Sequence, residues 1–192
     1  MRSIFKTTIF VILCGLFMMQ SDVSAQKSKQ GVNDKELKFP VVEGWEMSEK
    51  TVYPTPELGY SVAYDSELGG TVTIYVYNGG LKKIPDSIED KILTSQMDQA
   101  KSDIKQYGKL GYYENVKEIN NGTVMVGGLS GKVKALHSSF NFTIKGRDVD
   151  SEIYLFGYQN NFVKIRATRP QSEGDNKALT TLLSKIDAMF AK

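Results

Sequence analysis

Hydrophobic and polar residues alternate most regularly between Gly131 and Pro170. Such alternation is typical of β-strands, because successive side chains of a strand point to opposite faces of the sheet. Two short runs interrupt the pattern, Lys-Gly-Arg-Asp at 145–148 and Gln-Asn-Asn at 159–161. Gly, Asn and Asp tolerate the backbone conformations that tight turns require. The pattern therefore predicts a meander of three long antiparallel strands joined by two turns.

The register of this meander decides which side chains share a face, because a shift of one residue turns a whole strand over. A first turn that pairs Ile144 with Val149 and a three-residue second loop that pairs Leu155 with Ile165 make one face continuously apolar. The other face then gathers polar and aromatic side chains from all three strands. We take it as the candidate binding face, with the members His137, Tyr154, Phe156, Lys164 and Arg166.

Two further segments space their apolar residues as helices do. The first follows Asp86-Ser87-Ile88-Glu89, which is close to a capping box, and stops at Gly108. We predict a helix over 86–107. The second follows Asn176 and predicts a closing helix that runs to the C-terminus. Each segment has one apolar stripe, which is typical of a helix that packs against a sheet.

Shorter β-prone runs precede and follow the first predicted helix. Asn120-Asn121-Gly122 separates two of them and predicts a hairpin, because Asn-Gly is a strong turn signal. The predicted strands are 37–40, 46–53, 59–64, 71–77, 115–119 and 123–126. With the meander they predict an α+β fold: a central antiparallel sheet of about six strands, flanked by helices in an α/β/α sandwich. We expect residues 37–192 to form one domain.

The N-terminal residues follow a different pattern. Arg2 and Lys6 precede an apolar run that is too short to span a membrane. Val23-Ser24-Ala25 then places small or permissive residues where a signal peptidase cleaves. We predict a cleaved signal peptide over 1–25, a flexible lead-in over 26–36, and a periplasmic or secreted location.

Composition narrows the classes of partner. The leader holds two of the 24 basic residues and one of the 22 acidic residues, so the mature chain carries a net charge of +1. This balance argues against a nucleic-acid partner, and we expect no stable membrane insertion after cleavage. The single cysteine, Cys14, lies in the leader, so the mature chain has no disulfide and no cysteine metal site. We expect no cofactor and no metal.

The two basic residues of the candidate face indicate which class of partner it would bind. Lys164 and Arg166 would project beside Tyr154 and Phe156, and cations with aromatic neighbours can bind a carboxylate or a phosphate. We therefore expect an unknown protein or a small anionic ligand. The alternative is that the first predicted helix covers this face.

The candidates for catalysis and metal binding are few. His137 is the single histidine, so a hydrolase with a histidine base would have to use it. Its place in mid-strand, opposite aromatic residues, favours a packed, hydrogen-bonded histidine instead. Asp148, Asp150 and Glu152 line one strand face, but the glycine and distal glutamate of a calcium loop are missing. We assign no catalytic and no metal-binding residue.

Several short motifs resemble a known family. The segments that carry the likeness are Phe39-Pro40, Gly44-Trp45, 71–77, 154–158, 164–168 and the final helix. Their order resembles the PsbP/Mog1-like superfamily, which includes DcrB-type bacterial envelope proteins. The resemblance implies a central antiparallel sheet flanked by helices, and an accessory or assembly role that is largely non-enzymatic.

We therefore expect an exported, non-catalytic binding or assembly module of the bacterial envelope. Two alternatives stay open: a hydrolase with His137 as its base, and a structural envelope component joined through an exposed edge strand. An open cleft with a nucleophile beside His137 would favour the first alternative. A long unpaired sheet edge would favour the second.

Overall fold

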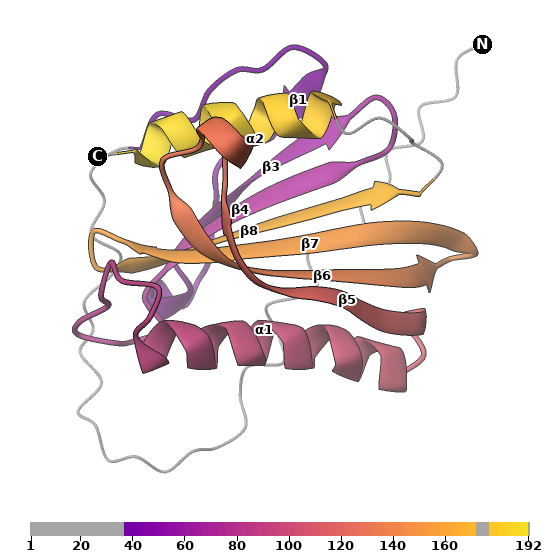
Figure 1. Ribbon diagram of the computed structural model, residues 1–192, viewed down its shortest axis with the longest axis horizontal. Coiled ribbons are helices and arrows are strands. Elements are labelled where there is room, and N and C mark those ends of the chain that lie inside the picture. The colour runs from indigo at the N-terminus through magenta and orange to yellow at the C-terminus, as the bar shows by residue number, and fades with distance from the viewer. Residues whose placement is uncertain (1–36, 172–176, 192) are drawn as a thin grey trace.

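The computed structural model describes residues 37–171 and 177–191 (Figure 1). The predicted signal peptide and lead-in lie outside these residues. The elements in chain order are β1 (Trp45–Met47), β2 (Thr51–Val52), η2 (Pro56–Leu58), β3 (Tyr60–Ser66), β4 (Thr71–Tyr77), α1 (Lys91–Lys109), β5 (Glu114–Met125), η3 (Gly128–Ser130), β6 (Lys134–Ile144), β7 (Arg147–Tyr158), β8 (Asn161–Pro170) and α2 (Lys177–Phe190). The η elements are single turns of 3-10 helix.

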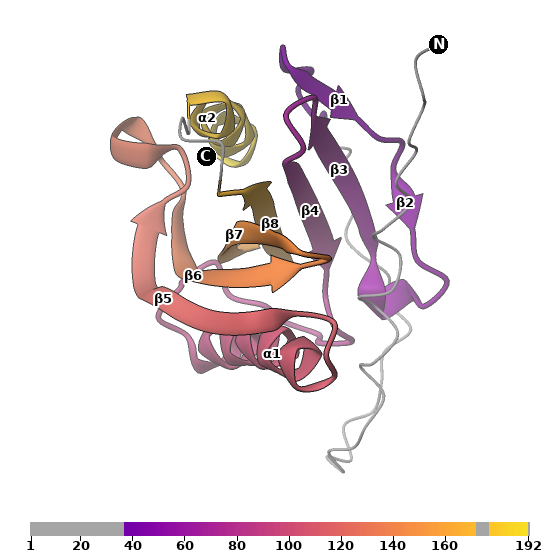
Figure 2. The ribbon, with the colours of Figure 1, turned by 90° about the vertical axis from the view of Figure 1, so that its right-hand side faces the viewer.

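All strands join one antiparallel sheet in the order β1-β3-β4-β8-β7-β6-β5, with β2 also paired to β3. The α+β class and the antiparallel sheet are confirmed. The sheet has eight strands rather than about six, and β1 and β2 are short strands beside β3. Figure 1 shows α2 on one side of the sheet and α1 on the other. Figure 2 shows the twist of the sheet, with β3 and β4 running steeply across the direction of β5 and β6.

Each side of the sheet has its own apolar core. On the α2 side, Val72 and Ile74 of β4 and Ile165 of β8 pack with Leu182 and Ile186 of the helix. On the α1 side, residues of β6 and β7 pack with the buried stripe of α1, and the participants include Phe140, Phe142, Ile153, Leu155, Leu93, Met97 and Ile104. Because β7 and β8 are buried on both faces, their register determines which side chains enter which core.

The structure corrects the start of the first helix. α1 begins at Lys91, and the Asp90 carboxylate caps it by accepting a hydrogen bond from the Ile92 N–H at 2.8 Å. The predicted cap at Asp86 was wrong. Ile88 explains why: its side chain is buried in the core on the α2 side, so this segment cannot belong to a helix whose stripe packs on the opposite side. The helix continues through Gly108 and ends at Lys109.

Two predictions of short strands also fail. β5 runs without interruption through Asn120-Asn121-Gly122, so the hairpin predicted there was wrong. Asn121 and Gly122 instead pair with Ser138 and His137 of β6, and two irregularities of register nearer the start of β5 bend it along its neighbour. Residues 37–40, predicted as an opening strand, form no strand in the structure.

The meander exists, but both turns are tighter than predicted. Lys145 and Gly146 form the first turn, so Phe142 pairs with Val149 and the register is two residues away from the prediction. That shift keeps each side chain on its predicted face. The central residues of the second turn are 159 and 160, both with positive φ, as in the two-residue hairpin turns that match strand twist. Leu155 therefore pairs with Lys164 rather than with Ile165.

Candidate functional site

The shift at the second turn separates the five predicted site residues. A change of one residue turns β8 over, so Lys164 and Arg166 lie on the α1 side of the sheet. His137, Tyr154 and Phe156 lie on the α2 side. The prediction that all five share one face was wrong, and the structure brings together only the members from β6 and β7.

Arg166 and Lys164 have contacts within the fold. Arg166 is 4% exposed, and its guanidinium donates to the Ser151 hydroxyl and to the Tyr113 hydroxyl, both at 3.3 Å. The Lys164 ammonium lies 4.8 Å from the centre of the Tyr75 ring. These contacts are typical of cations that pack on aromatic side chains inside or beside a core.

Phe156 belongs to the core on the α2 side. It is 2% exposed, and its ring meets that of Phe190 edge-on with the centres 5.2 Å apart. A side chain so enclosed contributes to packing and offers no surface to a ligand.

The two remaining residues meet a third that the prediction did not include. The Glu152 carboxylate oxygen Oε2 accepts a hydrogen bond from the Tyr154 hydroxyl at 2.6 Å and lies 3.1 Å from His137 Nε2. The His137 and Tyr154 rings are cross-strand neighbours, with their centres 4.9 Å apart. Glu152 lies two residues before Tyr154 on the same face of β7, so the period of the strand was the available signal for it.

The electrostatics of this trio favour an ionised carboxylate. The hydrogen bond from His137 lowers the pKa of Glu152, desolvation opposes this, and the hydrogen bond from Tyr154 lowers it further. Burial raises the pKa of the Tyr154 phenol, and the Glu152 charge adds to this effect. The phenol therefore stays protonated and donates, while Glu152 stays charged.

The trio opens into a cavity beside α2. The cavity has a volume of about 240 Å³ and is open to solvent on one side. Its other walls come from the end of β5, from η3 and from α2, and the lining residues are Val124, Met125, Val126, Gly128, Thr180 and Leu183. We call this the Glu152 pocket. Its exposed lining is mainly apolar, and its polar groups are the trio and Thr180, which is close to the usual composition of a small-molecule site.

One wall of the pocket is held in place by a buried carboxylate. Asp187 of α2 is 5% exposed and accepts hydrogen bonds from the backbone N–H groups of Lys132 and Val133, the latter at 2.8 Å. These residues follow η3, so the contact ties the η3 turn to α2. Gly127 and Gly131 permit the close approach, because a Cβ on Gly131 would lie 2.7 Å from the Gly127 nitrogen.

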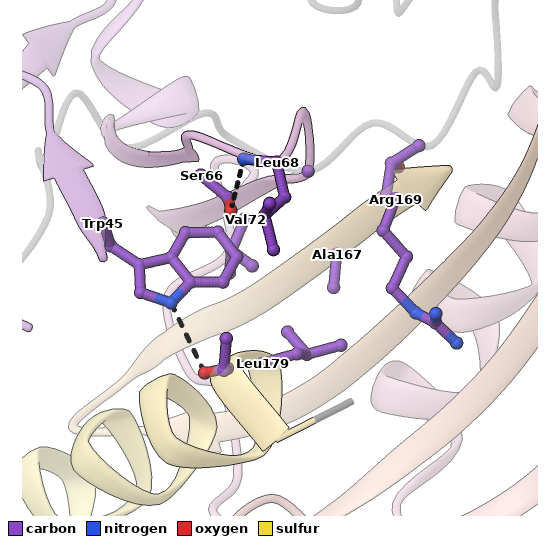
Figure 3. Close-up of a pocket in the computed structure, with 10 residues that line it drawn as sticks. Trp45, Ser66, Leu68, Val72, Ala167, Arg169 and Leu179 are labelled. Carbon is purple, nitrogen blue, oxygen red and sulfur yellow. Dashed lines mark hydrogen bonds between the residues drawn. The ribbon is translucent and has the colours of Figure 1, made fainter. Parts of the chain in front are cut away.

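A second, much smaller hollow lies where the first turn of α2 faces β1, β3 and β4 (Figure 3). Its volume of about 20 Å³ is close to the space that one water molecule needs. The Trp45 indole N–H donates to the Ala178 carbonyl at 3.3 Å, and Figure 3 shows the ring over the first turn of α2. Trp45 packs against the core on the α2 side, and the hollow is too small for a ligand.

The described residues contain no group of three or more His, Cys, Asp or Glu side chains placed to hold a metal ion. No helix among residues 37–171 and 177–191 is both long enough and apolar enough to cross a membrane. Comparison of the chain with models of known protein families and with curated protein sequences finds no match.

Proposed function

We propose that this chain is an exported, non-catalytic binding module of the bacterial envelope, and that the Glu152 pocket is its ligand site. The observation that carries the proposal is an open, mainly apolar cavity with a fixed carboxylate, imidazole and phenol on one wall. The leader pattern over 1–25 supports export. The sheet between two helices supports the resemblance to PsbP/Mog1-like proteins, whose members are largely non-enzymatic.

The contacts of His137 favour binding over hydrolysis. Its Nε2 atom faces the Glu152 carboxylate, and no serine or threonine hydroxyl is hydrogen-bonded to the ring within the described part of the chain. A histidine that activates a nucleophile needs that hydroxyl or a positioned water within reach. The arrangement instead fixes the imidazole against the strand, as in a preorganised binding wall.

The proposed ligand differs in charge from the one that the sequence suggested. The small anionic ligand was inferred from Lys164 and Arg166 beside Tyr154, and these cations lie on the opposite side of the sheet from the pocket. The pocket presents a carboxylate in their place. We propose a small molecule that is not an anion.

A fragment screen with pocket-blocking variants tests the proposal. Thr180 lines the pocket from the exposed face of α2, so Thr180→Trp should fill the cavity without disturbing the core. Thr181→Trp is the matched control, because Thr181 is exposed on the same helix and does not line the pocket. We expect fragments detected by saturation-transfer NMR to bind the wild type and Thr181→Trp, to be lost with Thr180→Trp, and to be recovered chemically unchanged. Fragments that bind all three proteins equally would refute the pocket as the site, and turnover of a fragment would favour the hydrolase.

A further inference from the structure

The two carboxylate oxygens of Glu152 differ in their hydrogen bonds. Oε2 accepts from Tyr154 and faces His137 Nε2. Oε1 makes no hydrogen bond within the described part of the chain, and the Glu152 side chain is 22% exposed. The pocket is therefore lined by a carboxylate that is oriented by two neighbours and retains one oxygen as an acceptor.

The basic residue of β8 on this side of the sheet lowers the pKa of Glu152 but is paired with another carboxylate. Arg169 pairs with Asp150, with its Nη2 atom 2.8 Å from Oδ2. Asp150 lies two residues before Glu152 and takes up the guanidinium charge locally. A carboxylate that keeps its charge beside apolar walls interacts with an ion more strongly than a carboxylate in water does.

The remaining walls specify the body of the ligand. Apolar contact comes from Val124 at the end of β5, from Val126 just after it, and from Leu183 of α2. An engineered apolar cavity of about 150 Å³ binds benzene. The Glu152 pocket, at about 240 Å³, has room for a single ring with a short polar arm.

We infer that the Glu152 pocket takes a small organic ammonium ion, whose N–H groups donate to Glu152 Oε1 while its apolar body lies between β5 and α2. This inference rests on the proposed function and adds the chemical class of the ligand. A neutral alcohol can donate to the same oxygen without the gain from opposite charge, and a carboxylate ligand is repelled.

Three probes that share a cyclohexyl body and differ in head group separate these cases: cyclohexylmethylamine, cyclohexylmethanol and cyclohexanecarboxylate. Each is titrated into the labelled protein, and binding is followed through the backbone amide signals of residues 124–126, 128 and 183. We expect the amine to bind about tenfold or more tightly than the alcohol, because hydrogen bonds to charged groups are the stronger ones. We expect the carboxylate to cause no saturable shift at these positions.

Glu152→Gln keeps the shape of the side chain and removes its charge. This variant should bind the amine about tenfold or more weakly than the wild type does, and its affinity for the alcohol should stay within about twofold. Asp148→Asn is the control, since it removes a carboxylate of the same strand face that neither lines the pocket nor pairs with Arg169. Tyr154→Phe is a second variant that retains the Glu152 charge, so the preference for the amine should persist in it.

The outcomes separate this inference from the proposed function. Equal binding of all three probes, abolished by Thr180→Trp, overturns the ammonium ligand and keeps the pocket as a binding site. An amine preference that survives Glu152→Gln also overturns it. Absence of pocket shifts with every probe overturns the ammonium ligand, while the fragment screen decides separately whether the pocket binds anything.

Discussion

Both carboxylate oxygens of Asp187 accept from one backbone group, the Lys132 N–H, at 3.0 Å for Oδ1 and 2.9 Å for Oδ2. The Val133 N–H donates to Oδ1 as well. α2 therefore supplies hydrogen-bond acceptors to the backbone that follows η3. The wall of the Glu152 pocket depends on this contact between Asp187 and Lys132, which are 55 positions apart in the chain.

Replacing this carboxylate should destabilise the fold. In Asp187→Asn the amide NH₂ faces backbone donors, so we expect the free energy of unfolding to fall by about 1–3 kcal/mol. Urea denaturation followed by circular dichroism measures the change. Asp98→Asn is the control, because the Asp98 side chain is 66% exposed and its ion pair with Lys101 lies at the surface. This substitution should lower the free energy of unfolding by about 1 kcal/mol or less. Equal losses in the two variants would contradict a special role for Asp187.

Gly157 of β7 is packed against the backbone of the segment before α1. A Cβ at this position would overlap the Pro85 carbonyl oxygen, and the segment around Pro85 cannot yield as a flexible side chain can. We expect Gly157→Ala to destabilise the protein by about 1–3 kcal/mol in urea. Gly122→Ala provides the comparison, since a Cβ on this β5 residue meets nothing within 4 Å. A neutral Gly157→Ala would show that this segment can move away from the sheet.

The acid sensitivity of the protein should depend in part on Glu152. Its pKa in the folded protein lies below the ordinary value of 4.5, chiefly because of the hydrogen bond from His137. As the pH falls through 4.5, the unfolded state takes up the proton first, so the contribution of Glu152 is present above that pH and is lost as the pH falls through the lower folded value. We expect the unfolding free energy of Glu152→Gln to vary less with pH in this window. If the unfolding free energies of wild type and variant vary with pH in parallel, the lowered pKa of Glu152 is contradicted.

Tyr64 should make the protein sensitive to alkali. Burial raises the pKa of its phenol from 10.0 to about 12, and its hydroxyl donates to the Pro40 carbonyl at 2.9 Å. Above pH 10 the unfolded state releases this proton more readily, so the contribution of Tyr64 falls as the pH rises toward 12. Absorbance titration of the phenolate should lose a late-ionising tyrosine in Tyr64→Phe. Tyr112→Phe, at a side chain that is 64% exposed, should leave the late ionisation in place.

Periodicity was sufficient to predict the elements whose two faces differ. Residues 71–77 form β4 with the predicted bounds, and the stripe after Asn176 forms α2. The same pattern could not fix the second turn of the meander. Gln159 adopts a φ of 48°, a conformation for which glutamine has no special preference, so a two-residue turn was not distinguishable from a three-residue loop.

That ambiguity explains why the site was only half predicted. His137 and Tyr154 lie on the neighbouring strands β6 and β7. The register predicted for the first turn was wrong by two residues, which leaves every side chain on its predicted face, so these two residues were placed together correctly. The register predicted for the second turn was wrong by one residue, so Lys164 and Arg166 were assigned to this face although they lie on the other side of the sheet. Glu152 shared the predicted face but was considered as a calcium ligand, and no role in the site was assigned to it. Its hydrogen bonds depend on side-chain geometry, which periodicity does not contain.

The pairing of β4 with β8 also has a consequence for the order of folding. Its partners run from Thr71 and Thr168 to Tyr77 and Phe162, 85 to 97 positions apart along the chain. Apart from β1 with β3, every other pair of neighbouring strands in the described part of the chain is consecutive in sequence. The β3–β4 hairpin and the β5–β8 meander can therefore form locally, but they merge only when nearly the whole chain is present, and distant pairings of this kind slow folding. A nascent or truncated chain that ends before residue 161 retains an unpaired edge on β4 and exposes the apolar residues of that strand, which makes it prone to aggregation.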